Sequence, residues 1–120
     1  MNLYIYIDGS DLEEIADAIS SSISDWLSQS KAHAKLINQV GEQDIDLPDQ
    51  RLGINLKISK GRELKEPLNL LYGLAKEHKR DFVLGIVNIE TDLREDICYF
   101  GNEEGKPDFY EISSYLGVKV

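Results

Sequence analysis

The chain is poor in cysteine, because Cys98 is the only one among its 120 residues. A single cysteine cannot close an intramolecular disulfide, and a chain without disulfides suits a reducing compartment. No apolar run approaches the roughly 20 residues that a helix needs to cross a bilayer. The N-terminus also lacks a basic segment followed by an apolar stretch, which is the pattern of a secretory signal. These absences predict a soluble, cytoplasmic protein that does not enter a membrane.

The short motifs of common enzyme classes are also missing. The sequence contains no G-x-S-x-G, no phosphate-binding P-loop and no H-E-x-x-H. Cys98 could pair only with His33 or His78, and it lies in an apolar segment, where a lone cysteine is usually a small buried hydrophobe. Two histidines and one cysteine fall short of the four ligands of a structural zinc site. We therefore predict a binding protein that is not an enzyme and needs no cofactor.

Basic residues are absent from the first 30 residues, which hold six acids. The net charge of −9 is uneven, since residues 31–80 hold ten bases and seven acids, whereas residues 81–111 hold nine acids and two bases. An acidic surface disfavours binding to nucleic acid or to an anionic membrane, and it favours a basic protein partner. The alternative is that the acids are solvated and serve only solubility.

The longest predicted element is a helix over residues 10–28. Ser10 and Glu13 fit a capping box at its start, and its outward face is small, polar and acidic. Spacings of three and four residues place on one inward stripe Leu12, Ile15, Ala16, Ile19, Ile23, Trp26 and Leu27. We expect this stripe to pack on a sheet, because the neighbouring apolar segments have the pattern of strands.

Four segments are predicted strands. Residues 3–7 alternate aliphatic side chains with tyrosines, which suits an internal strand with an aromatic second face. Residues 52–58 alternate apolar and polar side chains, which predicts one face in the core and one in water. Residues 82–89 are nearly all apolar and predict a buried internal strand, and residues 97–100 predict a short one. Residues 31–39 fit either a short strand or an extension of the first helix.

Two further helices complete the prediction. Pro67 is expected at the first position of the second helix, where its missing N–H is not needed, and Leu68, Leu71, Ala75 and His78 form its inward stripe. A short helix is predicted after Pro107 and ends at Gly117. Its inward residues are expected to be Phe109, Ile112, Tyr115 and Leu116.

The predicted order is β-α-β-β-α-β followed by β-α, within a single domain over residues 1–120. The first six elements match the split βαβ, ferredoxin-like arrangement, an α+β fold with helices packed on an antiparallel sheet. The sheet is expected to have four to five strands, with the fifth beside the fourth. The alternative is an open sheet with parallel pairs and helices on both faces.

Carboxylates at strand ends suggest an alternative function. Asp8 ends the first strand, and Glu90 and Asp92 follow the fourth. If those strands ran parallel, the three carboxylates could hold Mg²⁺ or Mn²⁺ in a small metal-dependent enzyme acting on a phosphorylated substrate. In the ferredoxin-like order these strands are antiparallel, and Asp8 then only helps the turn into the helix.

A second acidic run resembles the start of a calcium loop. It contains Asp44, Asp46 and Asp49. The EF-hand pattern requires an oxygen ligand at the fifth position and glycine at the sixth, where this chain has Pro48 and Asp49. We therefore predict an acidic surface loop and no metal site there.

Aromatic residues lie among acids near the C-terminus, with an acidic turn predicted over residues 90–96. Aromatic anchors inside a charged rim are typical of protein-binding surfaces. In the alternative, Phe100 and Phe109 belong to the core and the acids are solvated. The predicted partner-binding residues are Glu90, Asp92, Glu95, Asp96, Tyr99, Glu103, Glu104, Asp108, Tyr110 and Glu111.

In its size, its acidity, its cytosolic character and its lack of catalytic residues, the chain resembles the immunity proteins of bacterial contact-dependent inhibition and related polymorphic toxin systems. Those proteins share no single motif, so the resemblance assigns no residue by position. It implies a partner, the basic C-terminal domain of a toxin, for example a nuclease, which the immunity protein binds and neutralises at or near its active site. The acidic stretches 90–96 and 103–111 are the expected contact.

Overall fold

The computed structural model describes residues 1–9, 11–39 and 51–119. Ser10 of the predicted capping box therefore lies outside the described residues. The same holds for the predicted acidic loop with Asp44, Asp46 and Asp49. Within the described ranges, no helix is long and apolar enough to cross a membrane.

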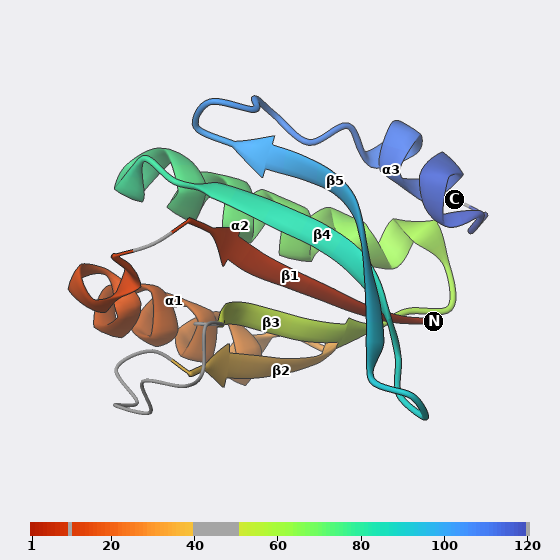
Figure 1. Ribbon diagram of the computed structural model, residues 1–120, viewed down its shortest axis with the longest axis horizontal. Helices are drawn as coiled ribbons and strands as arrows, with labels where there is room; N and C mark the ends of the chain where they lie inside the picture. The colour runs from red at the N-terminus through yellow and green to blue at the C-terminus, as the bar shows by residue number, and fades with distance from the viewer. Residues whose placement is uncertain (10, 40–50, 120) are drawn as a thin grey trace.

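The described residues form one antiparallel sheet in the order β2-β3-β1-β4-β5. Its strands are β1 (Asn2–Asp8), β2 (His33–Asn38), β3 (Leu52–Lys57), β4 (Asp81–Asn88) and β5 (Leu93–Gly101). This is the predicted ferredoxin-like topology with a fifth strand beside the fourth, so the parallel alternative is wrong (Figure 1). The ambiguous segment after the first helix is a strand.

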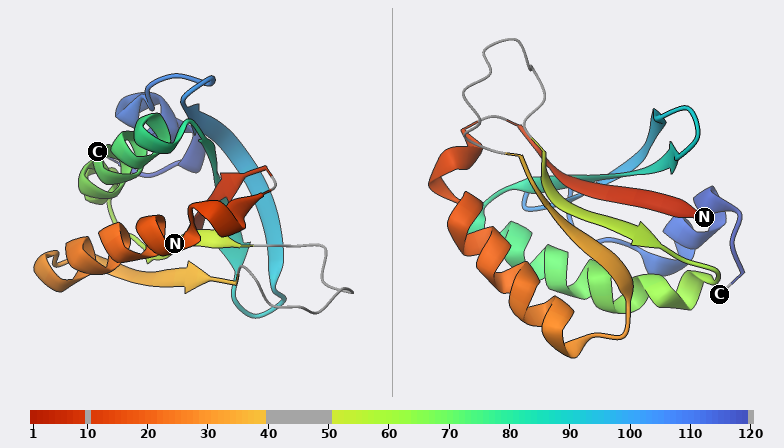
Figure 2. Two further views of the ribbon diagram at one scale, coloured as in Figure 1. Left: turned by 90° about the vertical axis from the view of Figure 1, so that its left-hand side faces the viewer. Right: turned by 90° about the horizontal axis from the view of Figure 1, so that it is seen from below.

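Helices α1 (Ala16–Gln29) and α2 (Lys65–His78) pack on the same face of the sheet, as the edge-on view in Figure 2 shows. Helix α3 (Phe109–Leu116) packs near β5 and the short 3₁₀ helix Gly61–Leu64. The core lies between the sheet and these helices, where alternate strand residues meet the helix stripes. Its fully buried members include Leu3, Ile5, Ile19, Ile23, Ile54, Leu71, Phe82 and Phe100.

The first helix has the predicted phase but is divided. A 3₁₀ helix covers Leu12–Glu14, and α1 begins at Ala16. Asp11 adopts a left-handed conformation with φ 58°, and the N–H of Ile15 donates to the carbonyl of Leu12 at 3.1 Å. The tighter turn still buries Leu12 completely, so the inward stripe survives the break.

Two helix details differ from prediction. Helix α2 begins two residues before Pro67, which is tolerated because N–H groups in the first turn have no intrahelical acceptor. In α3, Asp108 caps the N-terminus by accepting from the N–H groups of Tyr110 and Glu111, and Gly117 ends the helix as expected. Tyr115 does not face inward: it is 55 % exposed, and Ser113 takes a buried place beside Ile112.

The last hairpin also differs from prediction. Strand β5 begins at Leu93, so the predicted acidic turn over residues 90–96 is wrong in its second half, and Glu95 and Asp96 pair with β4. An extra residue, Ile97, interrupts the register opposite Leu84 and Gly85. Charged residues and a bulge are common on edge strands, because they discourage pairing with other chains.

Candidate functional site

The second face of β1 is aromatic and faces away from the helix layer. No helix among the described residues covers it, yet Tyr4 and Tyr6 are only 3 % and 8 % exposed. Their rings stack with centroids 5.1 Å apart. Tyr4 lies over Gly85, where any Cβ would overlap the phenol ring. The neighbouring strands thus shelter the two tyrosine rings. These rings form the floor of the uncovered face.

Each phenol on this floor has a polar partner. Tyr4 donates a hydrogen bond to the carboxylate of Asp96 on β5, and Tyr6 donates to the side chain of Asn55 on β3. Burial first, and then the bond to Asp96, raise the pKa of Tyr4 well above its usual value. Tyr4 therefore remains neutral and ties β5 to the centre of the sheet.

A small hollow opens beside the two tyrosines on this face. Its volume is about 210 Å³, and it is bordered by Asp8 and Asp96 on the one hand and by Arg51 and Arg94 on the other. Charges of both signs therefore surround an aromatic floor. This composition suits contact with a polar protein surface better than capture of an apolar molecule.

Tyr99 stands at the acidic end of the same face. It pairs across the hairpin with Val83, and its side chain is 44 % exposed. The pKa of its phenol is raised, first by the negative charge of Asp96 and then by partial burial and the charge of Asp8. The charge of Glu104 adds a smaller effect. An exposed aromatic ring is thus surrounded by carboxylates from three segments of the chain.

The loop after β5 is held against the same end of the sheet. The Asp81 carboxylate accepts from the backbone N–H groups of Glu103 and Glu104 at 2.9 and 3.1 Å. Gly101 and Gly105 exchange backbone hydrogen bonds of 2.8 and 3.0 Å. Both glutamate side chains remain exposed, so the loop presents two further carboxylates. We call Asp8, Asp96, Tyr99, Glu103 and Glu104 together the β5 surface.

The structure divides the predicted partner-binding residues. Asp96, Tyr99, Glu103 and Glu104 belong to the β5 surface, whereas Glu95 pairs with Ile86 and lies on the side of the helix layer. Glu90 and Asp92 lie at the end of β5 opposite Tyr99, in the turn just before the strand begins at Leu93. Asp108, Tyr110 and Glu111 belong to α3, where Asp108 serves as the cap and Tyr110 is 66 % exposed.

Phe100 and Phe109 were the two aromatic residues that could belong either to a binding surface or to the core. Phe100 is buried in the core, stacked on Phe82 with centroids 5.6 Å apart. Phe109 is half-buried, with the ammonium group of Lys65 5.0 Å from its ring centroid. These two residues serve the fold, and the exposed aromatic residues of this region are Tyr99, Tyr110 and Tyr115.

The geometric condition of the metal hypothesis is not met. Strands β1 and β4 are antiparallel, and Asp8 pairs with Asp81, at the end of β4 away from Glu90 and Asp92. Among the described residues, no three acidic, histidine or cysteine side chains are grouped so that they could hold a metal ion. Asp8, Glu90 and Asp92 therefore do not form a shared metal site.

Cys98 has the environment of a structural cysteine. It is half-buried in β5, and burial, followed by Glu111, raises the pKa of its thiol to about 11. A nucleophilic cysteine needs the opposite shift, because the thiolate is the reactive form.

Sequence reasoning missed Asp8 as part of the acidic end, and it missed the exposed side chains of Ile89 and Leu93. Asp8 reaches the β5 surface only through the pairing of β1 with β4 and of β4 with β5. The alternation of Tyr4, Tyr6 and Asp8 was the available signal, since it places all three on one face.

The comparisons with known proteins give no relative for this site. The chain matches no family model, no curated protein and no solved structure.

Proposed function

We propose that this chain is an immunity protein that binds and neutralises a cognate basic toxin domain through the β5 surface. The observation that carries the proposal is Tyr99, an exposed aromatic ring among the carboxylates of Asp8, Asp96 and Glu104. Tyrosine is a frequent energetic anchor in protein interfaces because it buries a large area and keeps a polar tip.

The carboxylates around Tyr99 give the surface its specificity for a basic partner. Opposite charges speed the diffusional encounter and exclude partners of the wrong sign. The surface is also preorganised, since Asp81 holds the loop of Glu103 and Glu104 and Tyr4 holds Asp96. A preorganised surface loses less conformational entropy on binding, which favours the tight complex that neutralisation requires.

The first experiment tests whether the chain protects cells from a toxin domain. The genes beside the one for this chain are searched for a toxin domain, which is then expressed with and without the chain while growth of the host cells is measured. We expect growth to be restored by the wild-type chain. We also expect the purified proteins to form a complex by titration calorimetry. Failure of both would reject the function.

A second experiment locates the surface. The variant Tyr99→Ala/Glu103→Lys/Glu104→Lys should weaken binding by at least about a hundredfold, because it removes the anchor and reverses two charges. It leaves intact the Tyr4–Asp96 bond. The matched control Glu14→Lys/Asp17→Lys reverses two exposed charges at the start of the first helix. Equal losses in the two variants would place the contact elsewhere.

A further inference from the structure

The turn between β4 and β5 exposes two aliphatic side chains. Ile89 is 70 % exposed and Leu93 is 71 % exposed, with Glu90 and Asp92 between them. In Figure 2 this turn bends away from the helix layer. Covering these two side chains would remove apolar surface from water, which favours association.

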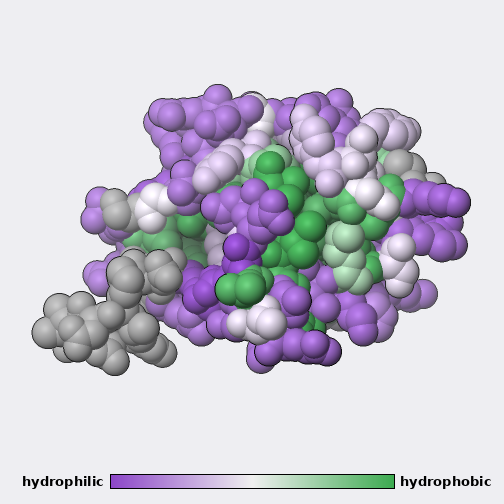
Figure 3. Space-filling view, turned by 45° about the vertical axis from the view of Figure 1, so that its right-hand side comes forward, coloured by the Kyte–Doolittle hydropathy of each residue, from purple (hydrophilic) through white to green (hydrophobic). Residues whose placement is uncertain are grey.

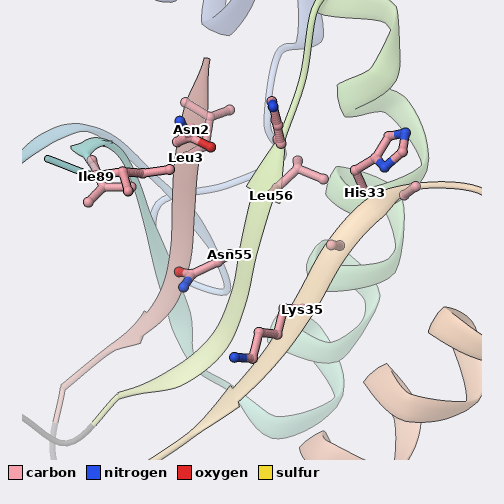
Figure 4. Close-up of a pocket in the computed structure, with 11 residues that line it drawn as sticks. Asn2, Leu3, His33, Lys35, Asn55, Leu56 and Ile89 are labelled. Atoms are coloured by element: carbon pink, nitrogen blue, oxygen red, sulfur yellow. The ribbon is translucent and has the colours of Figure 1, made fainter.

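A groove of about 520 Å³ adjoins this turn. Val87 and Ile89 border it on one side, and β2 borders it on the other, across the beginning of β1 and the end of β3 (Figure 4). Its basic residues are His33, Lys35 and Lys57. None of the described residues that line it is acidic, which sets the groove apart in a chain with net charge −9.

The two lysines of the groove are free to bind a carboxylate. No lysine among the described residues forms an ion pair with an acid of this chain. Lys65 and Lys76 lie over aromatic rings, whereas Lys35 and Lys57 are exposed at the groove. Lys35 is paired in register with Asn55, and its side chain extends over β3 in Figure 4.

The acidic turn and the basic groove therefore form one continuous surface, because Ile89 belongs to both. Figure 3 shows hydrophobic side chains gathered in the middle of one face of the molecule, with hydrophilic ones around them. A two-fold symmetric interface requires a self-complementary patch of this kind, in which each copy supplies both halves of the contact.

We propose that the chain forms a two-fold symmetric homodimer in which the β4–β5 turn of each copy occupies the basic groove of the other. Glu90 and Asp92 of each copy then pair with Lys35 and Lys57 of its partner. Ile89 and Leu93 become covered where they meet the groove of the other copy, whose Val87 and Ile89 supply apolar contacts. A small anion would satisfy the lysines but would leave both aliphatic side chains in water, so a second copy fits both halves of the surface.

The test uses the full chain without any toxin, and it is independent of the proposed function. Sedimentation velocity is measured over about a hundredfold range of protein concentration, at low and high salt. Three samples accompany the wild type: Lys35→Glu/Lys57→Glu, Glu90→Lys/Asp92→Lys, and an equimolar mixture of these two variants. Circular dichroism checks that each variant is folded.

We expect the wild type to dimerise with rising concentration and each variant alone to be monomeric, because each brings like charges together. The mixture should recover a dimer, since both of its groove–turn contacts then join opposite charges. High salt should raise the wild-type dissociation constant at least about tenfold.

Three results would overturn the proposal. One is a wild type that stays monomeric at all concentrations. This includes a monomer that binds inorganic tripolyphosphate at Lys35 and Lys57, because the groove would then be a site for a small anion. Another is a mixture that stays monomeric while the wild type dimerises. The third is growth of ever larger oligomers, because a two-fold contact closes at two copies.

Discussion

At the scale of single residues, Tyr4 connects the core to the candidate binding surface. Its ring lies over Gly85, and its hydroxyl donates to Asp96, which in turn lies beside Tyr99. Tyr4 is nearly buried, whereas Tyr99 is half open to solvent. The buried tyrosine fixes the position of the carboxylate, and the exposed one is left available for a partner.

The environment of Tyr4 predicts loss of stability in alkali. Burial raises its pKa in the folded protein, so the unfolded chain releases this proton first, near pH 10. The free energy of unfolding should therefore be fully present below about pH 10 and should fall as the pH rises above that value. Tyr4→Phe should flatten this decline, while lowering stability at pH 8 by about 1 kcal/mol through the lost hydrogen bond. Urea unfolding at pH 8 and at pH 10.5–11 measures both effects, and identical slopes for the two proteins would contradict the assignment.

At the scale of elements, helix α1 packs on the half of the sheet formed by β2 and β3. Ile19 and Ile23 are fully buried against the sheet, while Asp17 and Ser21 face solvent. The 3₁₀ break before Ala16 does not change this phase, because Leu12 and Ala16 both remain buried. The helix contacts β2 and β3, so it stabilises the half of the sheet that carries the basic groove.

Truncation of a side chain in the inward stripe of α1 should lower the stability of the protein. Ile19→Ala should lower the free energy of unfolding by about 2–5 kcal/mol, from lost burial and the cavity that remains. Ser21→Ala and Asp17→Ala, on the outward face, should each change it by less than about 0.5 kcal/mol. Urea unfolding of the three variants makes the comparison. An Ile19→Ala variant as stable as Ser21→Ala would show that the helix faces are assigned wrongly.

At the scale of the whole molecule, the uncovered face of the sheet carries lysines toward β2 and carboxylates toward the end of β5, with Arg51 and Arg94 at the hollow beside the tyrosines. His33, Lys35 and Lys57 lie toward β2, and the carboxylates of the β5 surface lie at the end where β1 finishes and β5 ends. A basic partner is therefore attracted to one part of the face and repelled by another. This separation orients the encounter as well as speeding it.

Salt should act on the rate of association with a toxin domain. The association rate constant should fall at least about tenfold between roughly 20 mM and 500 mM NaCl, with a smaller change in the dissociation rate. Stopped-flow fluorescence with the Tyr99→Ala/Glu103→Lys/Glu104→Lys variant as control separates this surface from the remaining acids. An association rate that does not depend on salt would rule out electrostatic steering.

Much of the fold is predictable because its signals are local. The alternation in residues 52–58, the apolar run of 82–87 and the helical stripe of Ile19 and Ile23 each reflect burial within one element. Their order then restricts the topology, since short antiparallel connections leave few arrangements. The strand predicted over residues 82–89 was wrong at its end, because β4 ends at Asn88 and Ile89 is exposed. The boundary of β5 was less accessible, because Glu95 and Asp96 are strand residues only through pairing with Ile86 and Gly85.

The sequence by itself therefore determined most of the elements, most of their inward faces and the uneven charge of this protein, because each depends on residues at most a few positions apart. Only the tertiary structure decided which acids lie together. Asp8 joins Asp96, Tyr99 and Glu104 through the pairing of β1 with β4, more than 70 residues away in the sequence, and through the pairing of β4 with β5. The same long-range packing turned Tyr115 outward and placed Ile89 beside the basic groove. Such contacts follow from register and from helix docking, which no short stretch of sequence specifies.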